Sequence, residues 1–257
     1  MSPQNPLIKK VMLLKEKSRE RKKTGLFVLE GLREIQMAQK GAYELELLCY
    51  CAEIMGTDEF VEKFNCPITA LSKSVYEKIA HRDTTEGVIA LAKAKEHQLE
   101  QISLNTENPL VLVAEAPEKP GNIGALLRTA DAAQVDAVFI ANPKTDVYNP
   151  NIIRSSVGCV FTTKIYTGAS EDIIAFLQSR NITVFCAALT ASLPYVDVDF
   201  TVPSAIVVGT ESTGLSPIWL TVSDQNLIIP MQGQIDSMNV SVSAAILIFE
   251  AKRQRGF

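Results

Sequence analysis

The sequence has few residues suited to metal sites or disulfide frameworks. Its 257 residues include five cysteines, an odd number, with no C-x-x-C pair, and only two histidines, His81 and His97. Zinc sites and disulfide frameworks need closely spaced ligands or paired cysteines, so we expect neither a metal nor disulfides. The five thiols are expected to be free and buried: Cys49, Cys51, Cys66, Cys159 and Cys186.

Long apolar runs are also missing. The longest candidate, residues 244–249, is far shorter than the roughly 20 residues needed to span a bilayer. The first ten residues lack the apolar stretch of a signal peptide. We therefore expect a globular protein of the cytoplasm with no membrane partner, in which 47% hydrophobic residues supply a sizeable core.

The chain has no overall excess of positive charge, since its formal net charge is −4. Residues 1–25 nevertheless hold many basic side chains against only Glu16 and Glu20: Lys9, Lys10, Lys15, Lys17, Arg19, Arg21, Lys22 and Lys23. A local basic cluster can attract a polyanion such as RNA, and the alternative is a solvated helix face.

The common phosphate-binding loops are absent. No G-x-G-x-x-G pattern occurs, which argues against a Rossmann dinucleotide site. Gly209 and Gly214 have the spacing of a Walker A loop, but Leu215 stands where that loop needs its lysine. An NTPase is therefore not expected.

What is present divides the chain into two parts with different patterns. Residues 1–97 alternate short elements, including a basic helix over about 6–22, and predict a small α/β domain. Residues 98–108 are polar and fit a linker or a polar helix. From 109 to 257, apolar strands alternate with helices, which predicts a mostly parallel sheet with helices on both faces. The predicted strands of this second part are 110–114, 137–141, 183–188, 205–208 and 227–229.

Three loops that follow predicted strands carry more glycine and polar residues than a turn requires: 120–130, 208–215 and 229–241. Each has a plain structural interpretation. Arg128 could form a surface ion pair, and Glu211 could be a solvated loop carboxylate. Ser237 or Asn239 could cap the last helix, and Asn122 could cap the helix after residues 120–121.

Together these loops resemble the three signature motifs of the SpoU (TrmH-like) RNA 2′-O-ribose methyltransferases of the SPOUT superfamily. They are similar to P-G-N-x-G-x-x-x-R-T-A, to G-x-E-x-x-G-L, and to I-P-M-x-G-x-x-x-S-L-N-V-S, with Met238 replacing the usual leucine. Residues 151–158, with Arg154, resemble a further family segment. Residues 1–97, most clearly 27–33, resemble more weakly the ribosomal-protein-like RNA-binding domain of many members.

The resemblance implies a homodimer and a C-terminal segment tied in a trefoil knot. It implies S-adenosylmethionine as cofactor, bound by Gly209, Leu215, Ile229 and Met238. The catalytic or motif positions it implies are Asn122, Arg128, Glu211, Ser237 and Asn239. With the basic cluster, it also indicates an RNA-binding set: Lys9, Lys10, Arg19, Arg21, Lys22, Lys23, Arg33 and Arg154.

The expected reaction is methyl transfer to a ribose 2′-hydroxyl of RNA. Because a sulfonium methyl is already activated, no metal is needed, and the protein must mainly align the reactants. The family's usual proposal makes the Arg128 position a general base. A guanidinium is hard to deprotonate, so binding the neighbouring phosphate and polarising the hydroxyl is physically easier. Ribosomal RNA is favoured because the N-terminal domain is present; tRNA, a non-catalytic RNA-binding protein and an unrelated small-molecule enzyme remain alternatives.

Overall fold

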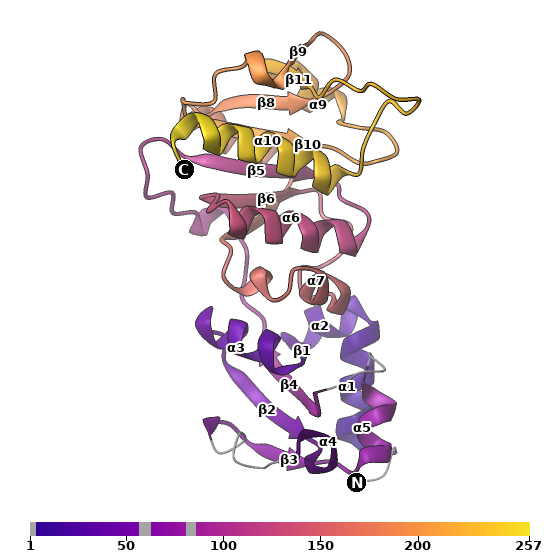
Figure 1. Ribbon diagram of the computed structural model, residues 1–257. Coiled ribbons are helices and arrows are strands. Elements are labelled where there is room, and N and C mark those ends of the chain that lie inside the picture. Colours follow the sequence, from indigo (N-terminus) through magenta and orange to yellow (C-terminus); the bar gives the residue numbers. More distant parts are fainter. Residues whose placement is uncertain (1–3, 57–62, 81–85) are drawn as a thin grey trace. The chain divides into compact units, whose positions relative to one another are not determined.

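The computed structural model describes residues 4–56, 63–80 and 86–257, which form two compact units. Unit 1 comprises Met1–Glu96 with Thr145–Thr162, and unit 2 comprises His97–Lys144 with Thr163–Phe257. Both units mix helices and strands, which confirms the predicted α/β class (Figure 1). Within the described part of the chain, no helix is long and apolar enough to cross a membrane.

Unit 1 is built on a four-stranded sheet in the order β1-β4-β2-β3. β1 (Leu26–Glu30) and β2 (Leu45–Tyr50) pair antiparallel with β4 (Val88–Lys93), and β3 (Ile68–Ala70) extends β2 in parallel. The apolar side of α1 (Pro6–Glu16) and of α5 (Lys73–Ile79) packs into one core with these strands. The unit also contains α3 (Leu32–Lys40) and α4 (Ala52–Met55).

The basic helix predicted over 6–22 is two helices. α1 ends at Glu16 and α2 (Ser18–Thr24) follows, because Lys17 between them is extended, with φ −112° and ψ 109°. The helix predicted over 58–64 lies almost entirely outside the described residues. The sequence analysis missed β3 and α4, which are too short to show a period.

The segment Thr145–Thr162 leaves the second sheet and completes unit 1. It contains α7 (Pro150–Ser155) and the 3-10 turn η3 (Cys159–Phe161). Phe27 of β1 stacks on Tyr148 and Phe161, with ring centroids 4.3 and 5.7 Å apart. The Tyr43 hydroxyl lies 3.2 Å from that of Tyr148. This buried aromatic cluster joins residues more than a hundred positions apart, and no local pattern predicted it.

Unit 2 contains a seven-stranded sheet in the order β7-β6-β5-β10-β8-β11-β9, and every neighbouring pair is parallel. The strands are β5 (Leu110–Glu115), β6 (Ala137–Ala141), β7 (Ile165–Gly168), β8 (Thr183–Ala187), β9 (Ser192–Pro194), β10 (Ser204–Val208) and β11 (Gln225–Ile228). Helices α6 (Pro120–Ala132) and α10 (Val240–Arg255) pack together over one face (Figure 1). Helices α8 (Ser170–Ser179) and α9 (Pro217–Val222) cover the other face. The predicted parallel sheet with helices on both faces is confirmed.

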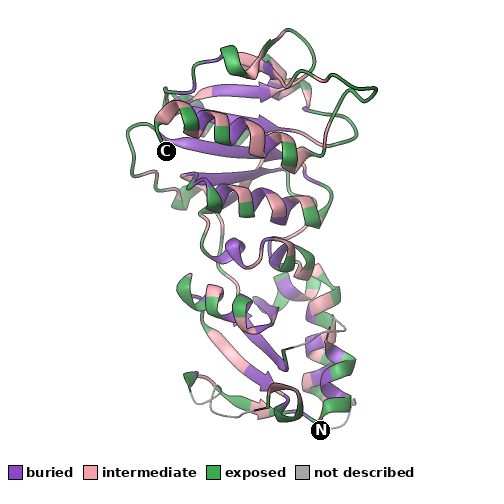
Figure 2. Cartoon of the chain, in the orientation of Figure 1, coloured by how far each residue is buried: buried purple, intermediate pink, exposed green. Residues whose placement is uncertain are grey.

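The central strands β5, β6 and β10 are buried along their whole length (Figure 2). Strands covered on both sides are continuous apolar runs, which is why the sequence predicted them. The sequence analysis missed β7, β9 and α9, which are short. Residues 98–108 belong to unit 2, where Leu99, Ile102 and Leu104 pack against the core formed with α8 and α9.

The C-terminal end of α10 is held by Arg255. Its guanidinium donates hydrogen bonds to the main-chain carbonyls of Asn108, Phe200 and Val202 at 2.8, 2.8 and 2.5 Å. Burial lowers the pKa of this half-buried group, although its charge is retained in all ordinary conditions. Arg255 is therefore occupied with fixing the last helix to the loops at the amino-terminal edge of the sheet.

Candidate active site

The three motif loops meet because they follow β5, β10 and β11. In a parallel sheet the carboxyl ends of all strands lie at one edge, so loops distant in sequence are brought together there. α6 begins at Pro120 with Lys119 as its N-cap residue, so the expected capping role of Asn122 is wrong. Asn122 lies instead in the first turn of α6, and its side chain is free to face the other two loops.

A cavity of about 590 Å³ opens at this edge. All four predicted cofactor-binding residues, Gly209, Leu215, Ile229 and Met238, line it. The remaining wall comes from residues 187–190 after β8, from 208–214 after β10, and from the start of α10. The sequence analysis missed the 187–190 loop, which carries no recognisable motif and enters the wall only because β8 lies between β10 and β11.

The loop after β10 is closed tightly on itself. The N–H groups of Thr210 and Gly214 each donate to the other residue's carbonyl, at 3.0 and 3.1 Å. A Cβ placed on Gly209 would lie 2.3 Å from the carbonyl carbon and oxygen of Gly214 and 2.6 Å from the nitrogen of Leu215. Glycine is therefore required at position 209 by the loop's own backbone.

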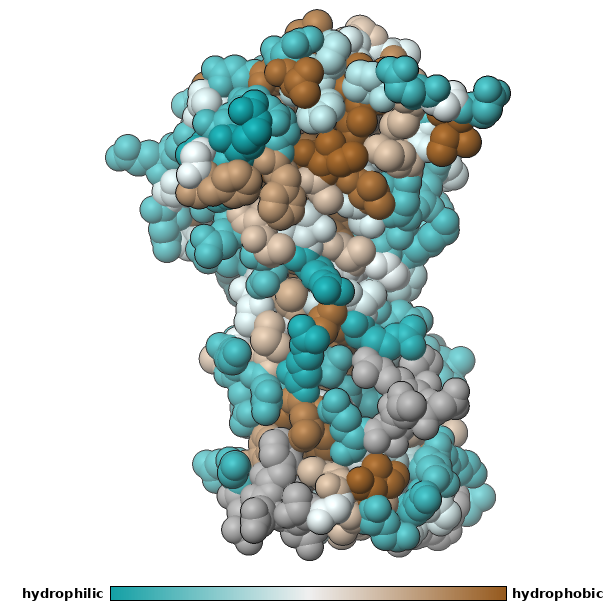
Figure 3. Space-filling view, in the orientation of Figure 1, coloured by the Kyte–Doolittle hydropathy of each residue, from teal (hydrophilic) through white to brown (hydrophobic). Residues whose placement is uncertain are grey.

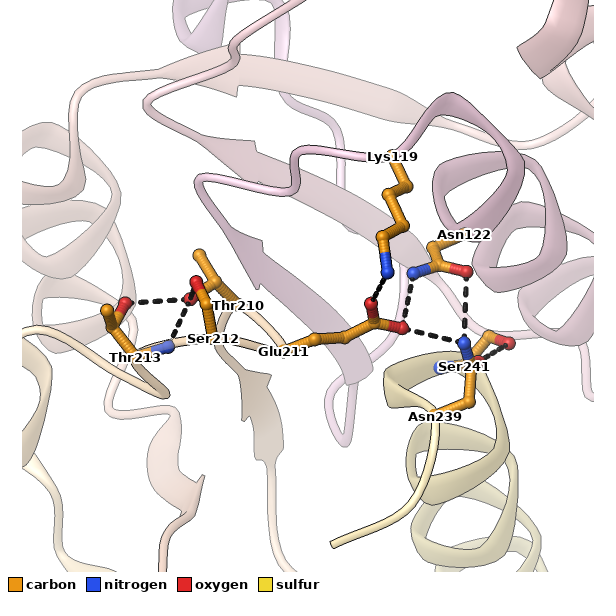
Figure 4. Close-up of polar contacts among 8 residues, drawn as sticks. All are labelled: Lys119, Asn122, Thr210, Glu211, Ser212, Thr213, Asn239 and Ser241. Atoms are coloured by element: carbon orange, nitrogen blue, oxygen red, sulfur yellow. Dashed lines mark hydrogen bonds and ion pairs between the residues drawn. The ribbon is translucent and has the colours of Figure 1, made fainter.

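Glu211 lies at the centre of a hydrogen-bond network that joins all three motifs (Figure 4). Its Oε1 accepts hydrogen bonds from the side-chain amides of Asn122 and Asn239, both at 2.7 Å. Its Oε2 accepts from the ammonium of Lys119. The Asn239 amide also donates to the carbonyl oxygen of the Asn122 side chain, at 3.1 Å. The network thus holds the amino-terminal ends of α6 and α10 to the loop after β10.

These contacts determine the protonation of Glu211. The hydrogen bond from Lys119, followed by that from Asn122, holds the pKa of the Glu211 carboxyl below its usual value, and the main-chain N–H of Val240 adds to the effect. Glu211 is therefore a carboxylate at neutral pH, with its oxygens engaged by donors.

Asn239 performs two roles at once. Its Oδ1 accepts from the main-chain N–H of Ser241 at 3.0 Å and caps α10, as the plain structural interpretation expected. Its amide nitrogen belongs to the Glu211 network. The capping interaction therefore fixes the orientation of the side chain that binds Glu211.

The other two predicted catalytic residues stand apart from this network. Arg128 is exposed on α6 and makes no hydrogen bond or ion pair with any residue that the structure describes. Ser237 is exposed at the cavity wall, and its hydroxyl lies 3.3 Å from a carboxylate oxygen of Asp236. Both side chains are thus accessible to a substrate.

Glu115, at the end of β5, is a residue that the sequence analysis missed. Its side chain is only 5% exposed and accepts hydrogen bonds from the main-chain N–H and the hydroxyl of Ser216, at 2.8 and 2.5 Å. Ser216 directly follows Leu215 of the cavity wall. Glu115 therefore anchors the carboxyl end of the loop that begins at Gly209.

The predicted RNA-binding side chains all lie in unit 1, and most of them are exposed: Lys9, Arg19, Lys22, Lys23, Arg33 and Arg154. Lys10 is half-buried and forms an ion pair with Glu46 at 3.4 Å. Arg21 is at odds with the prediction. It is 4% exposed and forms a bidentate ion pair with Asp146 at 2.7 and 2.9 Å, so its guanidinium is not available to a phosphate.

Comparison with known proteins places this chain among enzymes with the same motifs. The SpoU rRNA Methylase family matches residues 109–249, and the MRM3-like substrate binding domain matches residues 5–90. The 23S rRNA (guanosine(2553)-2′-O)-methyltransferase RlmP of Bacillus subtilis is 28% identical over 234 residues, which is 91% of both chains. A crystal structure of an RNA 2′-O ribose methyltransferase shares 37% identity, with a TM-score of 0.87 over 100% of this chain and 98% of that one.

The SpoU methyltransferase AviRb from Streptomyces viridochromogenes, solved with AdoMet, shares 25% identity, with a TM-score of 0.89 over 98% of each chain. The match to the family covers more than half of the 257 residues, and it spans the three loops that build the cavity and the Glu211 network. The chain therefore belongs to the SpoU rRNA methylase family.

Proposed function

We propose that the protein transfers a methyl group from S-adenosylmethionine to a ribose 2′-hydroxyl of RNA. The observation that carries this proposal is the cavity of about 590 Å³ with the Glu211 network beside it. Its volume is in the range of small-molecule sites, about 300–1,000 Å³. Its wall combines apolar side chains, such as Leu215 and Met238, with the exposed backbone of a glycine loop. This combination fits a cofactor with a flat base and a polar tail.

In this proposal Gly209, Leu215, Ile229 and Met238 hold S-adenosylmethionine, which supplies an electrophilic methyl group on a positively charged sulfur. The chain itself must align the acceptor hydroxyl, and such alignment contributes about 7–11 kcal/mol in well-oriented systems. The oxygen–carbon bond forms as the oxygen–hydrogen bond breaks, and the proton passes to water.

Glu211 acts as a positioning residue. A carboxylate that already accepts from Lys119, Asn122 and Asn239 is a weak proton acceptor, because a new proton would disrupt three donors. It fixes the helix ends that form one side of the acceptor site. Ser237, exposed at the cavity wall, is placed to contact the cofactor or the ribose.

Arg128 is proposed to bind the phosphate next to the target ribose and to polarise the hydroxyl. Its exposed guanidinium has the planar fork that matches phosphate oxygens. Arg128→Ala should leave the affinity for S-adenosylhomocysteine near that of the wild type and lower the methylation rate at least about 100-fold. Arg128→Lys should be nearly as slow. Arg180→Ala, which removes an exposed arginine beside Phe176, is the matched control and should keep the wild-type rate.

The experiment combines calorimetry with S-adenosylhomocysteine and transfer of a labelled methyl group to RNA. Binding of the ligand without methyl transfer to any cellular RNA would favour a non-catalytic RNA-binding protein. A lack of binding at millimolar ligand would contradict the proposal altogether. If Arg128→Ala methylated RNA at the wild-type rate, the role assigned to this arginine would be wrong.

Ribosomal RNA is the proposed substrate, and the cytoplasm the proposed compartment. The match of residues 5–90 to an MRM3-like substrate binding domain and the 23S rRNA activity in the name of RlmP support this choice. Mapping of 2′-O-methyl groups in ribosomal and transfer RNA, with and without the gene, identifies the target. Loss of a methyl group from a tRNA alone would favour the alternative substrate.

The exposed basic side chains of unit 1 are proposed to bind RNA phosphates. Arg21 is left out of this set because Asp146 occupies it. Replacing Lys22 and Lys23 together with glutamine should weaken RNA binding and reduce the salt dependence by about two phosphate contacts. The affinity for S-adenosylhomocysteine should not change. Unaltered RNA binding in this variant would show that the basic end of α2 is only a solvated surface.

A homodimer is also proposed. α10 exposes Val242 and Phe249, at 48% and 40%, and the chain ends in Phe257 at 77%. Figure 3 shows apolar surface where this helix runs. Sedimentation should give twice the mass of the chain. Phe249→Glu should shift the protein toward monomer, and a wild-type monomer that still methylates RNA would contradict the proposal.

The trefoil knot and the domain boundaries complete the proposal. A knotted C-terminal segment should shorten the contour released by mechanical unfolding below the roughly 3.4 Å per residue of an open chain. Residues 1–97 and 109–257, joined by 98–108, are proposed as the two domains. Because Thr145–Thr162 completes unit 1, residues 1–97 expressed alone should fold less stably than when that segment is fused to them.

A further inference from the structure

Lys119 is an unfavourable residue for its position. It is the N-cap of α6, where a side-chain oxygen normally accepts a hydrogen bond, and its side chain makes no such bond. A positive charge at a helix N-terminus also opposes the helix dipole. Its ion pair with Glu211 is on the surface, since 69% of the lysine side chain is exposed, and such pairs add little stability. The stability of the fold therefore does not explain this lysine.

The backbone at this residue is nonetheless fixed. The residue before a proline is restricted to extended conformations, and Lys119 precedes Pro120 with φ −90° and ψ 117°. The carbonyl of Lys119 accepts from the main-chain N–H groups of Asn122 and Ile123. The lysine stem thus starts from a rigid point at the end of α6.

Its ammonium lies at the boundary of the acceptor site. Lys119, Asn122 and Glu211 line a small hollow that shares Gly209, Glu211 and other wall residues with the large cavity. The same ammonium binds Glu211, as Figure 4 shows. Glu211 holds the site together but is an anion, and an unpaired anion at this point would repel RNA phosphates.

We propose that Lys119 bridges Glu211 and a phosphate of the bound RNA beside the target ribose, and so positions the substrate. An ammonium has three donors, and Glu211 needs only one of them. The other two are exposed toward solvent and can bind phosphate oxygens without releasing Glu211. This inference rests on the proposed RNA methyl transfer and adds a substrate-positioning residue to it.

The test measures kcat/KM for unmodified 23S ribosomal RNA transcribed in vitro, over a series of KCl concentrations, with saturating S-adenosylmethionine. Lys119→Met should lower kcat/KM about tenfold at low salt and reduce the slope of its logarithm against log salt by about one. Lys119→Arg should keep the slope. Lys164→Met, an exposed lysine before β7 at the opposite edge of the sheet, is the control and should behave as wild type.

A purely structural role is separated from phosphate binding in the Glu211→Gln background. If the lysine contacts phosphate, Lys119→Met still reduces the salt slope when residue 211 is neutral. An unchanged slope in Lys119→Met, or an effect that disappears in the Glu211→Gln background, would overturn the inference. Failure of the proposed function is recognised separately, because the wild-type protein would then neither bind S-adenosylhomocysteine nor methylate RNA.

Discussion

Replacing Gly209 with alanine tests the geometry of the cofactor loop most directly. The added Cβ would meet the backbone of Gly214 at 2.3 Å and that of Leu215 at 2.6 Å. A real Cβ does not approach other atoms this closely, and the atoms in its path belong to main chain that cannot rotate away. The loop must therefore open, which breaks the paired hydrogen bonds between Thr210 and Gly214.

The size of the effect follows from these contacts. Two main-chain hydrogen bonds contribute about 0.5–1.5 kcal/mol each, and overpacking costs about 1–3 kcal/mol. A loss of about 2 kcal/mol that falls on the bound state weakens S-adenosylhomocysteine roughly 30-fold. If the strain falls on the folded state, the melting temperature drops by roughly 4–8 °C.

Calorimetry with S-adenosylhomocysteine and thermal unfolding together measure both outcomes. Gly121→Ala is the matched control, because its Cβ meets nothing within 4 Å and it lies in the first turn of α6. That substitution should keep ligand affinity, and alanine is favoured over glycine in a helix. Wild-type affinity together with a wild-type melting temperature in Gly209→Ala would refute the reasoning about this loop.

Two further predictions concern buried or half-buried arginines. Arg255→Met should lower the free energy of unfolding by about 2 kcal/mol, because three main-chain carbonyls lose a charged donor; Arg253→Met, which removes only an exposed pair within α10, should cost under about 0.5 kcal/mol in urea titrations. Asp146→Asn should destabilise unit 1 by about 3 kcal/mol, because it leaves the buried charge of Arg21 without its partner. Burial acts to raise the pKa of Asp146, but hydrogen bonds from Arg21 and Ser18 and the charge of Arg21 outweigh it and lower the pKa. The contribution of the carboxylate is therefore complete above its ordinary pKa of 3.8 and is lost as the pH falls through the lowered value. The difference in unfolding free energy between wild type and Asp146→Asn should stay constant from pH 8 to about 5 and shrink below about 4, and a difference that grew in acid would contradict this assignment.

The sequence by itself determined the features that depend on local pattern. Strands β5, β6 and β10 are continuous apolar runs, and such runs identify buried parallel strands wherever they occur. The loops after β5, β10 and β11 were identified as parts of one site because parallel strands end at a common edge. Gly209 was correctly singled out, although the expected reason was close approach to the cofactor, whereas the structure gives the backbone of its own loop.

The tertiary structure alone decided which side chains meet. Glu211 is 89 residues from Asn122 and 28 from Asn239 in sequence, and nothing local indicates that one carboxylate oxygen accepts from both. Arg21 lies in a run of basic residues that favoured an exposed role, but its partner Asp146 is 125 residues away. Periodicity and turn residues report how one segment meets solvent or core. The pairing of polar groups depends instead on which segments become neighbours, and that is settled only when the whole chain packs.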